Sequence, residues 1–241
     1  MAVSVSLLAS GSRANCALVS SSTTRILVDA GLSCRETFKR LRALGERPED
    51  LSAILITHEH SDHVAGLRRL ATKLNVPVFL TDPTHREWSR AARNEDGTVP
   101  ILPRRERFAS GVSFQVGDIE IKPFTIPHDA ADPVGFTFRT EGVKIGYATD
   151  LGYMPVSVRD HLRGCDILVI ESNHDLEKLR QEERRAVQRC KEQEPCRVSG
   201  CEGAYAEQPQ RQHWRSRAPL PGDKAGRQHY AYRHAPNHFN A

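Results

Sequence analysis

Residues 54–63 read Ile-Leu-Ile-Thr-His-Glu-His-Ser-Asp-His, an apolar strand followed at once by three histidines and a carboxylate. Imidazole nitrogen and carboxylate oxygen are ligands for zinc, and also for manganese or iron. On a turn that leaves a strand, the alternate residues His58 and His60 can converge on one cation, and Asp62 and His63 can face a second. The plainer alternative is a histidine-rich surface turn, and the positions of other acids and histidines argue against it.

Three further candidate ligands also stand where an apolar stretch ends. His128 lies in Ile-Pro-His-Asp, Asp150 ends Ile-Gly-Tyr-Ala-Thr-Asp, and Asp29 ends Ile-Leu-Val-Asp. Each alone is typical of an ordinary turn residue. Together they indicate that one edge of a sheet is lined with metal ligands.

The chain around these residues is long enough for one domain or two small ones, with 241 residues of which 39% are hydrophobic. Short Val, Ile and Leu runs alternate with amphipathic stretches, and the strands outnumber the helices. We therefore predict an α/β (α+β) fold in which a mixed sheet or a pair of sheets has helices outside. The predicted strands are 3–8, 25–28, 53–57, 77–80, 119–125, 134–139, 143–148 and 167–170, and the predicted helices are 34–44, 64–74, 83–92 and 155–162.

The pattern changes after Leu176. Leu, Ile and Val become rare, and the basic character is confined to this end, because residues 1–175 hold 21 Lys+Arg against 22 Asp+Glu while residues 176–241 hold 13 against 8. Such a stretch buries too little apolar surface to offset the ordering of its backbone. We predict a folded domain over residues 1–178 and a disordered or frame-shifted tail over 179–241, with residues 176–189 as a fraying charged helix.

Composition also bears on the compartment. No window approaches the roughly 18 apolar residues of a membrane span, and the first twelve residues lack the features of a secretion signal. Six cysteines without a Cys-x-x-Cys pair fit reduced thiols. We expect a cytoplasmic protein with no membrane association and no obligate protein partner.

The motifs resemble those of the metallo-β-lactamase fold superfamily, namely Leu-Val-Asp-Ala-Gly (27–31), Thr-His-Glu-His-Ser-Asp-His (57–63), Pro-His (127–128) and Ala-Thr-Asp (148–150). More narrowly, residues 9–16, 128–136, 148–153 and 171–175 resemble YycJ (WalJ)-type proteins, which are associated with exonuclease action on duplex DNA ends. The resemblance covers about residues 1–180. It implies an αββα sandwich with a dinuclear site of zinc, manganese or iron along one edge of the sheets.

The resemblance also implies roles for individual residues. His58, His60 and His128 would bind the first metal, Asp62 and His63 the second, and Asp150 would bridge the two. Asp29 would orient the site without touching a metal. His174 stands in a family-like segment and is a candidate substrate contact, with structural hydrogen bonding as the equal alternative.

The sequence departs from the family pattern near its end. The superfamily completes its second metal site with a further histidine, in this branch within a Gly-His-Leu-Ser-like segment, and no such segment follows Asp175. We therefore expect an incomplete second half of the sandwich and an incompletely liganded second metal. Our hypothesis is a reading-frame shift from about residue 180, and the alternative is a lineage-specific tail.

The expected function is metal-dependent hydrolysis of a phosphodiester, with DNA as substrate and an exonuclease as the specific form. Two cations about 3.5–4 Å apart lower the pKa of a shared water toward neutral, and Asp62 and Asp150 are the expected catalytic carboxylates. The alternatives are a hydrolase of small esters, thioesters or lactones, and a non-catalytic remnant. We expect reduced activity because of the missing last ligand.

Overall fold

The structure is a computed structural model, and it describes residues 3–94, 96–172 and 228–233. Two six-stranded sheets form its centre. The first has the strand order β1-β2-β3-β4-β5-β6, which are Ser4–Ala9, Cys16–Ser20, Arg25–Val28, Ala53–Leu55, Val78–Leu80 and Arg105–Arg107. The second has the order β12-β11-β10-β9-β8-β7, which are Gln228–Arg233, Ile167–Ser172, Val143–Ala148, Val134–Thr140, Ile119–Thr125 and Phe114–Val116.

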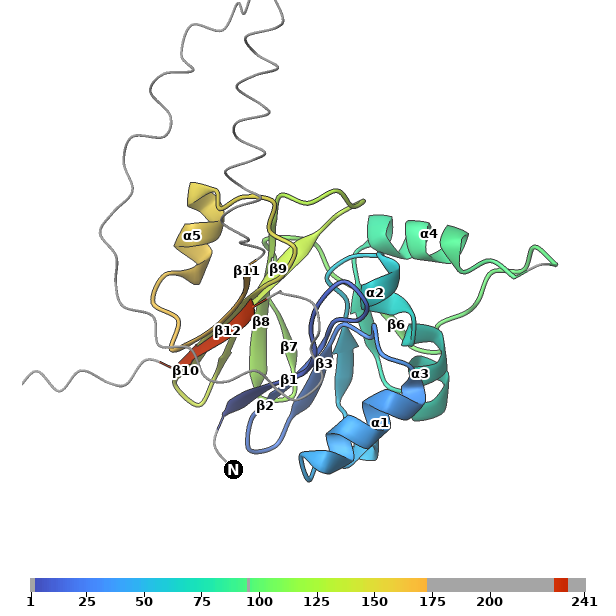
Figure 1. The fold of residues 1–241 in the computed structure, drawn as a ribbon, viewed down its shortest axis with the longest axis horizontal. Coiled ribbons are helices and arrows are strands. Elements are labelled where there is room, and N and C mark those ends of the chain that lie inside the picture. The colour runs from blue at the N-terminus through green and yellow to red at the C-terminus, as the bar shows by residue number, and fades with distance from the viewer. Residues whose placement is uncertain (1–2, 95, 173–227, 234–241) are drawn as a thin grey trace, which may run out of the picture. The chain divides into compact units, whose positions relative to one another are not determined.

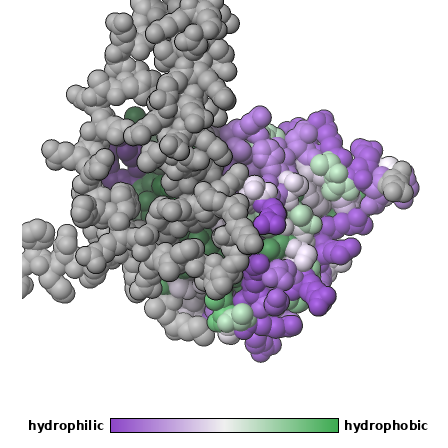
Figure 2. Space-filling model, in the orientation of Figure 1, coloured by the Kyte–Doolittle hydropathy of each residue, from purple (hydrophilic) through white to green (hydrophobic). Residues whose placement is uncertain are grey.

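Helices lie outside both sheets. Figure 1 shows α1, α3 and α4 on the side of the first sheet and α5 on the side of the second. The helices are α1 (Cys34–Ala43), the 3-10 turn η1 (Pro48–Asp50), α2 (Ser61–Val64), α3 (Leu67–Leu74), α4 (Asp82–Ala91) and α5 (Val156–Leu162). Over α3 and α4 the visible surface is mostly hydrophilic (Figure 2), as expected for amphipathic helices that bury one face.

Three apolar layers follow from the alternation of side chains along each strand. On β3, Ile26 and Val28 face the second sheet while Leu27 packs toward the helices. The central layer joins Ile26, Val28 and Leu55 to Phe136, Phe138 and Tyr147 of the second sheet. Because strands such as β2 are buried on both faces, they appear in the sequence as continuous apolar runs.

These layers confirm the predicted αββα sandwich. Ser33 caps α1, since its Oγ accepts a hydrogen bond from the backbone N–H of Glu36 at 3.3 Å. Two tight hairpin turns, at residues 117–118 and 141–142, connect β7 to β8 and β9 to β10.

Some predicted boundaries were wrong. The expected helix 64–74 is divided into α2 and α3, because Gly66 donates to the carbonyl of Ala30 and a Cβ at Gly66 would lie 1.9 Å from the carbonyl oxygen of Leu32. The helix expected over 155–162 begins one residue later, at Val156, and Pro155 occupies the N-cap position before it. Strands β2, β6 and β7 were not predicted.

The tail lies mostly outside the described residues, as do the predicted helix 176–189 and His174. Strand β12 falls in a stretch where no strand was expected. The division at about residue 178 therefore stays a prediction. Among the described residues, no helix combines the length and apolarity needed to cross a membrane.

Candidate metal centre

The topology brings the predicted ligands to one edge of the sandwich. Strands β3 and β4 are parallel, so Asp29, which follows β3, and His58, which follows β4, leave the sheet at the same edge. The backbone N–H of Val134 donates to the carbonyl of Thr57 at 3.1 Å and joins the second sheet to this edge. His128 reaches it from the loop between β8 and β9, and Asp150 follows the end of β10.

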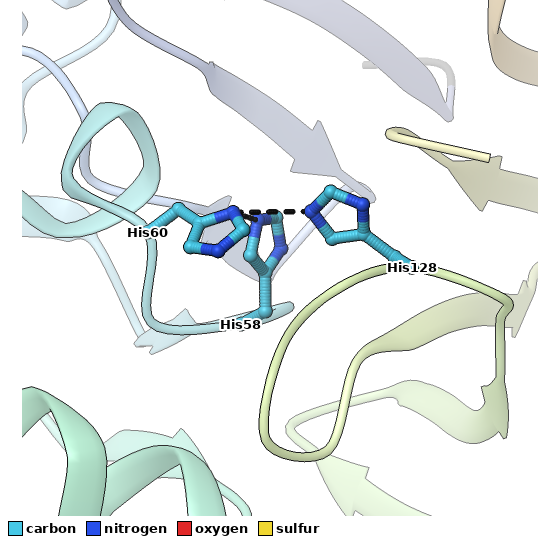
Figure 3. Close-up of side chains that lie close together, drawn as sticks. All are labelled: His58, His60 and His128. Carbon is cyan, nitrogen blue, oxygen red and sulfur yellow. Dashed lines mark hydrogen bonds between the residues drawn. The ribbon is translucent and has the colours of Figure 1, made fainter. Parts of the chain in front are cut away.

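Three imidazole rings converge there, from His58, His60 and His128 (Figure 3). His60 Nδ1 lies 3.1 Å from His58 Nε2 and 3.1 Å from His128 Nε2. The rings stand nearly edge to face, with interplanar angles of 77° to 85°. The nitrogens of all three rings therefore point at one place instead of stacking their faces.

This arrangement fits a cation. Two nitrogens bound to one tetrahedral zinc at about 2.0–2.1 Å would lie about 3.3–3.4 Å apart, close to the observed separations. Imidazole nitrogens are ligands of zinc, manganese and iron alike. The donor set and its geometry suit a divalent metal without selecting one.

His63 and Asp150 stand beside the three histidines. His63 Nε2 lies 2.8 Å from Asp150 Oδ2, and His58, His63 and Asp150 form a second group that could hold an ion. Asp62 Oδ2 is farther from His63 Nε2, at 3.6 Å. The structure thus brings together five of the six predicted ligands, whereas Asp62 belongs to neither group. The ligand roles of all six remain predictions.

Asp29 is fully buried and sits behind this group. Its carboxylate accepts hydrogen bonds from the backbone N–H of Thr57 at 2.9 Å and from Thr57 Oγ1 at 3.0 Å. Its Oδ2 lies 2.9 Å from His63 Nδ1, so His63 Nε2 is left to face Asp150. This is the geometry that the predicted orienting role requires.

Burial and charge act differently on the histidines. Burial lowers the pKa of His58 to about 2 and lowers the pKa of His128 as well, so both imidazoles are neutral at pH 7 and keep a lone pair for a metal. Burial also lowers the pKa of His63, but the carboxylates of Asp29 and Asp150 outweigh it and raise that pKa to about 10. His63 is therefore the histidine most strongly coupled to carboxylates.

The family model of the beta-lactamase superfamily domain matches residues 24–195. The chain belongs to this superfamily.

Two relatives in the superfamily carry informative names. The chain is 38% identical over 180 residues to "Exodeoxyribonuclease YycJ" of Bacillus anthracis, and 36% identical over 175 residues to "Exodeoxyribonuclease WalJ" of Streptococcus pneumoniae. These matches cover 75% and 73% of this chain, but only 66% and 64% of the relatives. They confirm the resemblance to the YycJ-type branch, and the chain spans about two thirds of the relatives' length.

Solved structures support the fold alone. A HARLDQ-motif mutant metallo-β-lactamase from Cronobacter sakazakii superposes with a TM-score of 0.55 at 20% identity, covering 76% of this chain and 82% of that one. The Rm3 metallo-β-lactamase gives a TM-score of 0.54 at 20% identity, covering 76% and 80%.

Two polar residues near the site, Glu59 and Asn15, were not predicted as site residues from the sequence. Glu59 Oε1 accepts a hydrogen bond of 2.7 Å from the backbone N–H of Ala131, which ties the loop of His58 to the loop of His128. Asn15 is buried against Asp62 and His63. Glu59 lies inside the histidine stretch and Asn15 inside the family-like segment 9–16, but neither pattern indicates what the side chain contacts.

Three arginines that could contact a phosphate, Arg68, Arg105 and Arg107, already have partners in the protein. Arg105 and Arg107 lie 3.5 Å and 3.4 Å from the carboxylate of Asp82, and Arg68 donates to Asn94 Oδ1. A pocket of about 240 Å³ adjoins this region and is lined by Asp82, His85, Arg86 and Arg105, none of them a predicted metal ligand. These contacts favour a structural role for the three arginines over contact with a phosphate.

Proposed function

We propose that this chain is a metal-dependent phosphodiesterase that acts on nucleic acid, and specifically a DNA exonuclease. The single observation that carries the proposal is the convergence of His58, His60 and His128 nitrogens beside the His63–Asp150 pair. The names of the YycJ and WalJ relatives support DNA as the substrate. Two cations at this edge would fit a phosphodiester, whose transition state gathers charge on several oxygens.

The chain's own residues divide the work. His58, His60 and His128 would hold the first divalent cation, and Asp62, His63 and Asp150 the second; such cations supply Lewis-acid stabilisation of anionic oxygen and lower the pKa of water. Asp29 fixes the ring of His63 through Nδ1, and Thr57 fixes Asp29. The low pKa of His58 keeps its imidazole free of a competing proton.

We also propose that turnover is lower than in the longer relatives. Among the described residues, the second cation would have Asp62, His63 and Asp150 as ligands. The family pattern adds a histidine in a Gly-His-Leu-Ser-like segment, and no such segment follows Asp175. A cation with fewer protein ligands is held more weakly. Side-by-side assay with the Bacillus anthracis relative checks this, and equal turnover at equal metal loading would contradict it.

The function is tested with end-labelled duplex DNA. We expect the full chain, loaded with manganese or zinc, to release mononucleotides from duplex ends, and we expect His60→Ala to abolish this release. His85→Ala is the matched control, because His85 is a histidine outside the cluster. A chain that folds and binds metal but hydrolyses a thioester dye and not a phosphodiester dye would support the small-ester alternative. Hydrolysis of neither dye would support the non-catalytic remnant.

A further inference from the structure

Asn15 lies at the end of the loop between β1 and β2, and only 2% of its surface is exposed. Its side-chain Nδ2 is 3.1 Å from Asp62 Oδ2 and 2.9 Å from His63 Nε2. A buried amide is therefore in contact with Asp62 and His63, two consecutive residues that we propose as ligands of the second cation. Burial of an amide is favourable only when its polar atoms are matched.

The orientation of this amide is determined by Gly11. Asn15 Oδ1 accepts a hydrogen bond of 3.0 Å from the backbone N–H of Gly11, and Nδ2 is 3.3 Å from the carbonyl oxygen of Gly11. If the amide turned over, its NH₂ group would face the N–H of Gly11, donor against donor. The NH₂ group is thereby held toward Asp62 and His63.

The backbone of Asn15 is held in the same place. Its N–H donates to the carbonyl of Asp62 at 2.7 Å, and its carbonyl accepts from the N–H of Gly31 at 3.0 Å. A Cβ at Gly31 would lie 1.7 Å from the carbonyl oxygen of Asp62, so only glycine permits this approach. The β1–β2 loop, the turn after β3 and the start of α2 therefore meet at Asn15.

The number of hydrogens favours one pairing. Nδ2 carries two hydrogens, but three polar atoms lie nearby, on Gly11, Asp62 and His63. His63 Nε2 also faces Asp150 Oδ2 at 2.8 Å, and it either donates a proton there or offers its lone pair to a cation. In both cases the two hydrogens of Asn15 remain for Gly11 and for Asp62 Oδ2.

We propose that Asn15 is a positioning residue for the second cation site: its NH₂ group holds the Asp62 carboxylate beside His63 Nε2. This inference rests on the proposed function, since it presupposes that Asp62 and His63 ligate a metal. Loss of an outer hydrogen bond to a metal ligand costs about 10–100-fold in affinity. The loss should fall on the second cation and spare the first, because the side chain of Asn15 is hydrogen-bonded toward Gly11, Asp62 and His63 and not toward the three histidines of the first site.

The experiment is a stepwise titration of the full chain with manganese. Calorimetry measures the affinity of each binding step, and the electron paramagnetic resonance spectrum of manganese shows whether two bound ions are coupled. We expect Asn15→Ala to weaken the second binding step about 10–100-fold, to leave the first within about twofold, and to remove the spectral coupling between two manganese ions. Ser12→Ala, an exposed position in the same loop, is the control and should behave as wild type. If Asn15→Ala cannot be purified, Asn15→Ser is used with the same criteria.

Every other result contradicts the proposal. Unchanged affinities would show that Asn15 does not position Asp62, and equal weakening of both steps would show a merely structural role, as would failure of both variants to fold. A wild-type chain that takes up a single cation would remove the site itself. The proposed function is judged separately, by phosphodiester hydrolysis of the wild-type chain, so the two can fail independently.

Discussion

At the scale of single residues, the site depends on histidines whose protonation is set by their surroundings. His58 and His63 are both completely buried, yet their pKa values move in opposite directions. The difference comes from the carboxylates: Asp29 and Asp150 contact His63, whereas His58 is surrounded mainly by other imidazoles. His58 is thus neutral in the absence of a metal, whereas His63 carries a proton that the carboxylates of Asp29 and Asp150 stabilise.

His60 is the residue that tests the first cation most simply, because its Nδ1 faces both other nitrogens. We expect His60→Ala to weaken binding of the first cation more than about 100-fold. Removal of a residue that only hydrogen-bonds to a metal ligand costs about 10–100-fold, and loss of a ligand itself should cost more. Isothermal titration with zinc measures this, and His85→Ala should bind as wild type. Equal affinities for His60→Ala and wild type would place the cation elsewhere.

Asp29 tests the orientation of His63. Its φ of 61° is tolerated by Asn as well as Asp, so Asp29→Asn preserves the backbone while placing an NH₂ group against donors of Thr57 or His63. We expect the second manganese to bind about 10–100-fold more weakly, measured by the same titration. If the second step is unchanged, Asp29 does not orient His63.

At the scale of elements, hydroxyl groups join the two sheets through one carboxylate. Asp118, in the β7–β8 turn, accepts hydrogen bonds from Ser21, Thr23 and Thr24 of the β2–β3 turn and from Thr140 of β9. These bonds hold the pKa of Asp118 well below its usual range, led by the bond from Thr24. The carboxylate therefore stabilises the folded state only while it is ionised.

The sign of the pH effect follows from that shift. Because the folded pKa is depressed, this stability is present above the unfolded pKa of about 3.9 and is lost as pH falls through the folded value. Since the group is exposed, we expect Asp118→Asn to cost only about 1 kcal/mol at pH 7, with the difference from wild type shrinking below pH 4. Urea unfolding at a series of pH values measures this, with Asp160→Asn as an exposed control. A difference that is constant with pH would mean that the charge is irrelevant.

Local patterns were enough to predict much of the fold and of the site. Asp29, His58 and Asp150 each follow an apolar run, and the edge they share follows from the strand directions. What the sequence could not show depends on distant contacts. The break at Gly66 arises from the carbonyl oxygen of Leu32, and the contact of Asn15 with Asp62 joins residues 47 positions apart.

At the scale of the whole molecule, the chain covers 66% and 64% of its YycJ and WalJ relatives, and no Gly-His-Leu-Ser segment follows Asp175 in its sequence. The reading-frame hypothesis predicts that another frame of the coding DNA, downstream of the Asp175 codon, encodes Gly-His-Leu-Ser followed by strand and helix patterns. Resequencing this region checks it. If no frame does so, the tail is genuine and the second cation must be held by fewer ligands or by another chain.

The metal content of the purified full chain tests the central claim most directly, namely that the histidine edge of the sandwich is a metal centre. Native mass spectrometry would count the ions per chain after dialysis against zinc or manganese, in wild type and in His60→Ala. We predict at least one retained cation per wild-type chain, a weaker second one, and loss of the first in His60→Ala. A folded wild-type chain that retains no cation would contradict the claim.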